Sequence, residues 1–189
     1  MEIQGAEASV EITDEKAVKR REEKKYRHPD LDERIRDERT REEVKNTRRA
    51  IKYGVNAPSA EKKDKDTIEF ERINGETWKK SGDLEAMKSA GENVAKMHHG
   101  NIIHGDLTTS NIIVNDKEAY LIDFGLSEVS ERVEDKAVDI HLLKQIIEAS
   151  HPEIAEEAWK KFMKGYNDYK ESEEVLERLE EVELRGRYK

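Results

Sequence analysis

Residues 101–127, NIIHGDLTTSNIIVNDKEAYLIDFGLS, alternate short apolar runs with polar side chains that bind metal ions or accept protons. Asp106 lies in the first polar segment, Asn111 precedes the run IIV, and Asp123 follows the run AYLI. The pattern predicts strand, loop and strand, then a hairpin turn at Asn115–Asp116 and a last strand. The stretch is therefore either an ordinary strand–turn–strand or a site that holds metal and phosphate.

Composition limits the class of protein. The chain has 189 residues, of which 34% are hydrophobic and 42% charged, whereas a typical domain is about 45–50% apolar and about 25% charged. Apolar residues still recur at helix and strand periods, which favours a folded chain over a disordered one. The absence of Cys excludes disulfides and zinc–thiolate sites and suits a reducing compartment. No apolar run approaches the ~20 residues of a membrane span, so we expect a cytoplasmic protein without a membrane partner.

Charge argues against a broad nucleic-acid-binding surface, because the formal net charge is −9. Two segments are nevertheless locally basic, KAVKRREEKKYR at 16–27 and RGRYK at 185–189. A limited contact with phosphate remains open for both, and solvated surface charge is the alternative.

The first 75 residues predict strands and one long helix. The segment 8–21 alternates as two strands joined at Thr13–Asp14, 28–54 reads as a helix between Pro29 and Gly54, and 67–71 reads as a strand. Apolar positions on the helix are sparse, so it either packs weakly or leaves a face for a partner.

Residues 76–189 predict a mostly helical part with a basic tail at 184–189. Residues 81–99 form a helix with one apolar face, and the chain after Gly125 is helical. The core-facing positions are Leu84, Met87, Gly91, Val94 and His98, then Ala155, Trp159, Phe162, Tyr166, Tyr169, Val175, Leu176, Leu179 and Val182. The expected class is α+β with two lobes, 1–75 and 76–189, around a cleft.

Carboxylate and amide oxygens point to Mg²⁺, which takes oxygen ligands and usually binds one or two carboxylates plus substrate phosphates. Asp123 and Asn111 are the predicted metal ligands. Asp106, in the loop between two apolar runs, is the predicted acceptor of a proton from a hydroxyl or a water.

The pattern H-G-D-x-x-x-x-N followed by D-F-G resembles the catalytic core of the protein-kinase superfamily. The resemblance implies a two-lobed kinase-like fold with a reduced N-lobe and a truncated helical C-lobe, and it makes Asp106, Asn111 and Asp123 catalytic. It also implies nucleotide-binding roles upstream. The residues concerned are Gly5, Ala6, Glu7 and Ala8 of a reduced glycine-rich loop, Lys19 and its ion-pair partner Glu43, and the adenine-facing hinge residues Glu71 and Ile73.

A closer resemblance rests on GAEA, KKYRHPDLD, RTREE, HGDLTTSNII, LIDFGLS, EDKAVDI and LRGR, which run in this order through the chain. Together they look like the PRPK family, the small atypical kinase subunit of the KEOPS complex, related to the RIO kinases. The family implies an ATP- and Mg²⁺-dependent ATPase and serine/threonine kinase. It implies as partners the other KEOPS subunits, including the enzyme that installs threonylcarbamoyl on adenosine 37 of tRNA. Arg185 and Arg187 become candidate contacts with tRNA or phosphate.

Departures from conventional kinases favour ATPase over kinase activity. Gly105 replaces the arginine that receives an activation-loop phosphate, and Thr108 replaces the lysine that neutralises the transferred phosphate. The 64 residues after Gly125 carry no A-P-E signature and are expected to be too few for a peptide-docking platform. Two alternatives stay open: a true protein kinase with external protein substrates, and a nucleotide-independent scaffold that bridges partners.

Histidines and one further acid support the loop. We expect His104 to hydrogen-bond backbone near Asp123 rather than transfer protons, and His98 and His99 to end a helix rather than bind metal. Asp139 either braces the catalytic loop or lies at a helix N-terminus. The hinge strand is unusually polar, with Glu69 and Arg72 where apolar residues are expected.

Overall fold

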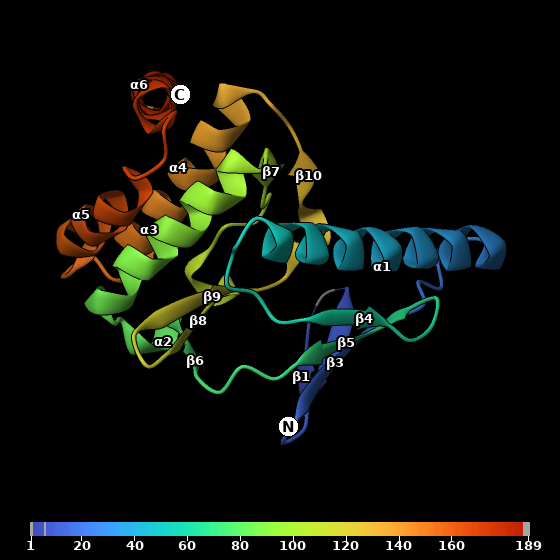
Figure 1. Cartoon of the computed structure of the whole chain (residues 1–189). Helices are drawn as coiled ribbons and strands as arrows, with labels where there is room; N and C mark the ends of the chain where they lie inside the picture. The colour runs from blue at the N-terminus through green and yellow to red at the C-terminus, as the bar shows by residue number, and fades with distance from the viewer. Residues whose placement is uncertain (1, 6, 187–189) are drawn as a thin grey trace.

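An antiparallel five-stranded sheet and one long helix form the N-terminal part of the chain (Figure 1). The computed structural model describes residues 2–5 and 7–186. The strand order is β1-β2-β3-β5-β4. The elements are β1 (Glu2–Gln4), β2 (Ala8–Ile12), β3 (Lys16–Arg21), α1 (Pro29–Lys52), β4 (Ala60–Lys62) and β5 (Thr67–Glu71).

Helices dominate the second part, as the sequence predicted. Small sheets of order β6-β8-β9 and β10-β7 lie next to them. The elements are β6 (Glu76–Thr77), α2 (Trp78–Ser81), α3 (Leu84–His99), β7 (Ile102–Ile103), η1 (Thr109–Asn111), β8 (Ile112–Asn115), β9 (Glu118–Leu121), η2 (Phe124–Leu126), β10 (Glu128–Val129), α4 (Val133–Ser150), α5 (Ala155–Tyr166) and α6 (Ser172–Gly186). No helix in the described part of the chain is both long and apolar enough to cross a membrane.

We propose that these parts are the two lobes, 1–75 and 76–189. The large sheet finishes with β5 at Glu71, and the next strand, β6, pairs with β8 in a different sheet. The segment 72–75 between β5 and β6 is therefore the connection between the lobes.

Several predicted boundaries were wrong, each for a local reason. The helix expected from residue 81 begins at Leu84, because the Asp83 side chain accepts a hydrogen bond from the Glu85 N–H at 2.8 Å and caps α3 there. The hairpin turn is Asp116–Lys117, since Asn115 still pairs with Glu118. Both turn residues have positive φ, which suits the twist of a two-residue hairpin. The chain after Gly125 first forms β10, which pairs with β7, and becomes helical only at α4.

Apolar packing is concentrated in the helical part. Its core contains nearly all the large buried side chains, including Trp78, Met87, Phe124, Phe162 and Tyr166, so the predicted stripe through α5 is confirmed as core. The core of the five-stranded part is much smaller and consists of Val44, Ala60 and Ile68, with Phe70 packed against it. Burial of apolar area therefore contributes far more to the second part than to the first.

Polar contacts replace the missing apolar face of α1. Arg36 Nη1 donates to Asp66 Oδ2 at 2.6 Å, and Arg36 Nε donates to the buried Asp32 at 2.8 Å. Further along the helix, Arg48 Nε donates to the carbonyl of Ala60 at 2.9 Å, and Asn46 Nδ2 donates to the carbonyl of Ser127 at 2.9 Å. The sparse hydrophobic pattern of α1 thus reflects polar docking onto both parts of the protein.

Helices α3 and α5 cross in close contact at two glycines. A Cβ added at Gly91 would lie 2.0 Å from the carbonyl oxygen of Phe162, and one added at Gly165 would lie 2.1 Å from that of Lys88. Neither distance is compatible with a side chain, so the backbones approach at the limit of contact.

Gly91→Ala should therefore destabilise the protein, although alanine normally favours a helix. We expect the free energy of unfolding to fall by about 1–3 kcal/mol because the helices must separate, measured by chemical denaturation. Lys96→Ala, at an exposed position of the same helix, is the control and should change little. An equal or greater stability of Gly91→Ala would contradict the close crossing.

Candidate active site

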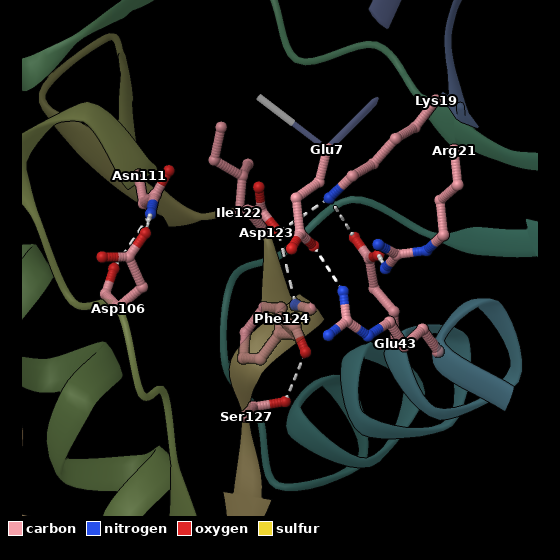
Figure 2. Close-up of polar contacts among 12 residues, drawn as sticks. Glu7, Lys19, Arg21, Glu43, Asp106, Asn111, Ile122, Asp123, Phe124 and Ser127 are labelled. Carbon is pink, nitrogen blue, oxygen red and sulfur yellow. Dashed lines mark hydrogen bonds and ion pairs between the residues drawn. The ribbon is translucent and has the colours of Figure 1, made fainter. Parts of the chain in front are cut away.

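Strand β3 and helix α1 bring three charged side chains together (Figure 2). Lys19 and Arg21 are two residues apart and therefore share one face of β3. Lys19 Nζ donates to Glu43 Oε1 at 2.9 Å, and Arg21 Nη2 donates to Glu43 Oε2 at 2.5 Å. Lys19 Nζ also donates to Asp123 Oδ1 at 2.8 Å. The predicted pairing of Lys19 with Glu43 is present, and it extends to Asp123.

Burial and neighbouring charge act in opposite directions on this group. Burial lowers the pKa of Lys19, but Glu43 and Asp123 outweigh burial and leave that pKa raised. Burial raises the pKa of Asp123, but Lys19 outweighs it and leaves that pKa lowered. Lys19 is thus a cation and Asp123 an anion at neutral pH. Burial raises the pKa of Glu43, and the two cations on its oxygens oppose that rise.

Asp123 adopts a left-handed backbone conformation, with φ 62° and ψ 69°. This conformation is uncommon for a residue other than glycine and persists where the surroundings enforce it. Here the carboxylate accepts hydrogen bonds from Lys19 and from the N–H of Gly125, the latter at 3.3 Å. The side chain remains 46% exposed, so one side of the carboxylate faces solvent.

Asp106 and Asn111 form a second group beside the first (Figure 2). Asn111 Nδ2 donates to both the carbonyl and Oδ2 of Asp106, each at 2.9 Å. The N–H of Ile122 donates to the carbonyl of Asn111 at 3.0 Å, which ties this group to the residue before Asp123. The structure therefore holds the three predicted catalytic residues in two adjoining groups.

The donor set fits Mg²⁺ better than a metal with many protein ligands. No three His, Asp or Glu side chains of residues 2–5 and 7–186 gather into a metal-binding cluster. The Asn111 amide oxygen is turned away from Asp106, as Figure 2 shows, and the Asp123 carboxylate is half-exposed. One carboxylate and one amide oxygen match an ion that takes most of its ligands from phosphates and water.

Hydrogen bonds from two sides fix the predicted catalytic loop at residues 104–106. His104 Nε2 contacts the carbonyl of Ile122 at 3.1 Å, so Nε2 carries the proton, and Nδ1 accepts from the N–H of Asp106 at 3.4 Å. Asp139 accepts from the N–H groups of His104 and Gly105 at 2.7 and 3.0 Å. Both predictions for these residues, backbone contact by His104 and bracing by Asp139, are confirmed.

Gly105 is required by the shape of this loop. Its φ is +78°, and an added Cβ would lie 2.3 Å from the carbonyl oxygen of Leu126. The position that holds arginine in conventional kinases thus has no room for a side chain.

Gly5 and Glu7 lie in the turn between β1 and β2, and Ala6 lies outside the described residues. The N–H of Gly5 donates to the carbonyl of Ala8 at 2.9 Å. The Glu7 side chain accepts from Arg39 Nη1 of α1 at 2.6 Å, and that hydrogen bond lowers the pKa of Glu7. The turn is therefore tied to the helix that carries Glu43.

The hinge residues lie at the connection between the parts. Glu71 ends β5, where its N–H donates to the carbonyl of Ser59 at 3.0 Å, and Ile73 lies in the connecting segment 72–75. A cavity of about 490 Å³ includes Phe70 and Glu71 but none of the residues around Lys19. The polar residues of this strand have local partners, since Glu69 pairs with Lys16 at 2.8 Å and Arg72 Nη1 donates to the carbonyl of Thr13 at 2.8 Å.

Of the two arginines predicted to contact tRNA or phosphate, the structure describes Arg185. Arg185 Nη1 pairs with Glu134 Oε1 of α4 at 3.0 Å, and its other nitrogen lies 3.6 Å from Glu181 of α6. Arg187 lies outside the described residues. These contacts of Arg185 are therefore with α4 and with its own helix, and not with the groups around Lys19 and Asp106.

Arg21 and Arg39 contact the predicted nucleotide residues but were missed from the sequence. Both carry a signal: Arg21 follows Lys19 at the two-residue period of a strand, and Arg39 precedes Glu43 by four residues on a helix. In a sequence with 42% charged residues, these arginines could not be told from solvated ones.

The sequence matches the RIO domain model over residues 8–140. A protein of Pyrococcus abyssi named KEOPS complex subunit Bud32 is 36% identical over 98% of this chain and 94% of its own length. The chain belongs to the RIO domain family, and KEOPS complex subunit Bud32 is a relative. A Methanoculleus marisnigri protein, named a probable bifunctional tRNA threonylcarbamoyladenosine biosynthesis protein, is 45% identical over 97% of this chain. The chain spans 35% of the length of that relative.

The fold agrees with the family. The Rio2 kinase from Chaetomium thermophilum, solved as an ADP/Mg²⁺-phosphoaspartate complex, superposes with a TM-score of 0.62 at 12% identity, covering 100% of this chain and 71% of its own. The predicted kinase-like α+β fold and the resemblance to the small KEOPS subunit are both confirmed.

Stability should decline as the pH falls below neutrality, because of His98. This imidazole is fully buried against Asp139 and Tyr166, and burial lowers its pKa below the ordinary 6.5. As the pH falls, the imidazole is protonated in the unfolded chain at a higher pH than in the folded protein, so protonation favours the unfolded chain. The stability that is present above pH 6.5 is therefore lost as the pH falls below this value.

His98→Gln should flatten the dependence of the unfolding free energy on pH between about 7 and 5, measured by urea titrations at each pH. His28→Gln, which alters an imidazole whose side chain is 74% exposed, is the control. An unchanged slope in His98→Gln would show that other groups dominate.

Proposed function

We propose that the protein binds ATP with Mg²⁺ and hydrolyses it, as the atypical kinase/ATPase subunit of a KEOPS complex that forms threonylcarbamoyladenosine on tRNA. The observation that carries the proposal is Lys19, bonded at once to Glu43 and Asp123, beside the bonded pair Asp106–Asn111. Family membership supports the partners, namely the other KEOPS subunits and, through them, tRNA in the cytoplasm.

Each residue has a role that its position supports. Lys19 would hold phosphate oxygens, while Glu43 holds Lys19. Asp123 and the amide oxygen of Asn111 would bind Mg²⁺, which neutralises developing charge on the phosphates when bound. The Asp106 carboxylate, fixed by Asn111, would accept the proton of the attacking water. We propose in addition that the turn at Gly5–Ala8 covers the phosphates and that Glu71 and Ile73 border the adenine.

Water is the favoured acceptor. Thr108 offers no ammonium group to the transferred phosphate, and its carbonyl accepts the N–H of Asn111 at 3.0 Å. Gly105 has no room for the arginine that reads activation-loop phosphorylation. The site therefore has groups for ATP but few for a peptide hydroxyl.

Asp123→Asn should abolish Mg²⁺-dependent ATP binding in calorimetric titrations, because the carboxylate of the metal site is lost. Asp106→Asn should retain binding while turnover falls roughly 10²–10⁴-fold, as expected for loss of a general base. Asp116→Asn, at the exposed tip of the β8–β9 hairpin, is the matched control and should behave as wild type. Normal ATP hydrolysis by Asp123→Asn would refute the site.

Release of phosphate should exceed transfer to protein. With γ-labelled ATP and an added acceptor such as casein, most label should appear as free phosphate, and tRNA with the partner subunits should raise that rate. Label transferred to casein faster than it appears in water would identify a protein kinase instead. If the wild-type protein binds no nucleotide, the remaining hypothesis is a nucleotide-independent scaffold that bridges partners.

A further inference from the structure

Arg21 is a second cation on the glutamate that pairs with Lys19. Its side chain is 6% exposed, that of Glu43 is fully buried, and the two meet at 2.5 Å. Lys19 is shared between Glu43 and Asp123, whereas the hydrogen bond of Arg21 to a carboxylate goes to Glu43. The two cations therefore hold Glu43 in different ways.

Charge balance explains why a buried arginine is tolerated here. Lys19 divides its hydrogen bonds between the fully buried Glu43 and the half-exposed Asp123, so without Arg21 the buried Glu43 would have to share its one cation. Removing one partner of a buried ion pair is strongly destabilising, because the other charge is left buried and uncompensated. Arg21 brings the group of Lys19, Arg21, Glu43 and Asp123 to neutrality. An arginine also stays protonated at any physiological pH.

The Arg21–Glu43 pair also borders the segment that carries Asp123. A Cβ added at Gly125 would lie 3.4 Å from both Arg21 Nη2 and Glu43 Oε2. Helix α1, which carries Glu43, also contacts residues 123–127 at a second point, where Asn46 Nδ2 donates to the carbonyl of Ser127 at 2.9 Å. Movement of α1 would thus disturb residues 123–127 directly.

We propose that Arg21 is a positioning residue that keeps Glu43, and with it α1, docked whether or not Lys19 is engaged by nucleotide phosphates. The Arg21–Glu43 pair then supplements the Lys19–Glu43 pair, and α1 stays in place without a nucleotide. The nucleotide-bound half of this inference rests on the proposed function, and the nucleotide-free half does not.

The nucleotide-free half is tested by amide hydrogen exchange of residues 40–47 in the full chain. Lys19→Met should leave their protection close to that of wild type, because Arg21 still holds Glu43. Arg21→Met should speed exchange there by about tenfold or more, as expected for loss of a charged hydrogen bond.

Arg36→Met is the matched control, since Arg36 also ties α1 to the sheet but pairs with Asp32 and Asp66. It should loosen the start of α1 and leave 40–47 protected. Equal exchange in Lys19→Met and Arg21→Met, or no change in Arg21→Met, would overturn the proposal.

The nucleotide-bound half is tested by steady-state ATP hydrolysis. Arg21→Met should lower kcat more than it changes KM for Mg-ATP, because Lys19 and Asp123 lose their fixed frame in the transition state. Arg21→Lys, which keeps the charge, should recover part of kcat, and Arg36→Met should lower the melting temperature without lowering kcat. If Arg21→Met and Arg36→Met have the same kcat and the same melting temperature, Arg21 has only a structural role and the proposal is wrong. A wild type that hydrolyses no ATP would refute the proposed function, while the exchange experiment still decides the role of Arg21.

Discussion

The contact of Lys19 with two carboxylates from distant parts of the chain is the constraint on which the site depends. Glu43 comes from α1 and Asp123 from the end of the β8–β9 hairpin, so one ammonium group joins the five-stranded part to the helical part. Buried charges are tolerated when they are paired and hydrogen-bonded. The glutamate satisfies this condition with one cation on each carboxylate oxygen, and the arrangement of α1 follows from it.

The two parts of the protein are held by different forces. In the helical part, large apolar side chains and the close crossing of α3 and α5 form a densely packed base. Asp139, which is buried in that base against His98, accepts hydrogen bonds from the backbone N–H groups of His104 and Gly105. The sheet part has a small apolar core, and α1 is anchored to it mainly by ion pairs and side-chain-to-backbone bonds. The loop predicted to be catalytic is therefore supported by an apolar base, whereas the geometry of the sheet part depends on charge.

Sequence patterns predicted elements that repeat a period over several residues. The strands 8–12 and 16–21, the helix from Pro29, and the core stripe through Phe162 and Tyr166 were all found this way. The three-residue strands β1 and β4 were not, because so short a segment shows no alternation. The backbone contact of His104 was expected, and the brace by Asp139 was one of two interpretations, the one that the resemblance to kinases offered. The buried contacts of His98 with Tyr166 and Asp139 were not expected.

The sequence by itself determined the fold family and the chemical types at the site, since H-G-D-x-x-x-x-N and D-F-G specify which carboxylates and amide are present and in what order. Tertiary structure alone decided which charges meet. Arg21 and Arg39 resemble every other arginine of a highly charged chain until β3 and α1 pack together, and only then does one reach Glu43 and the other Glu7. Ion pairs between residues far apart in sequence leave no local pattern, because the partner of each charge is set by packing and not by spacing.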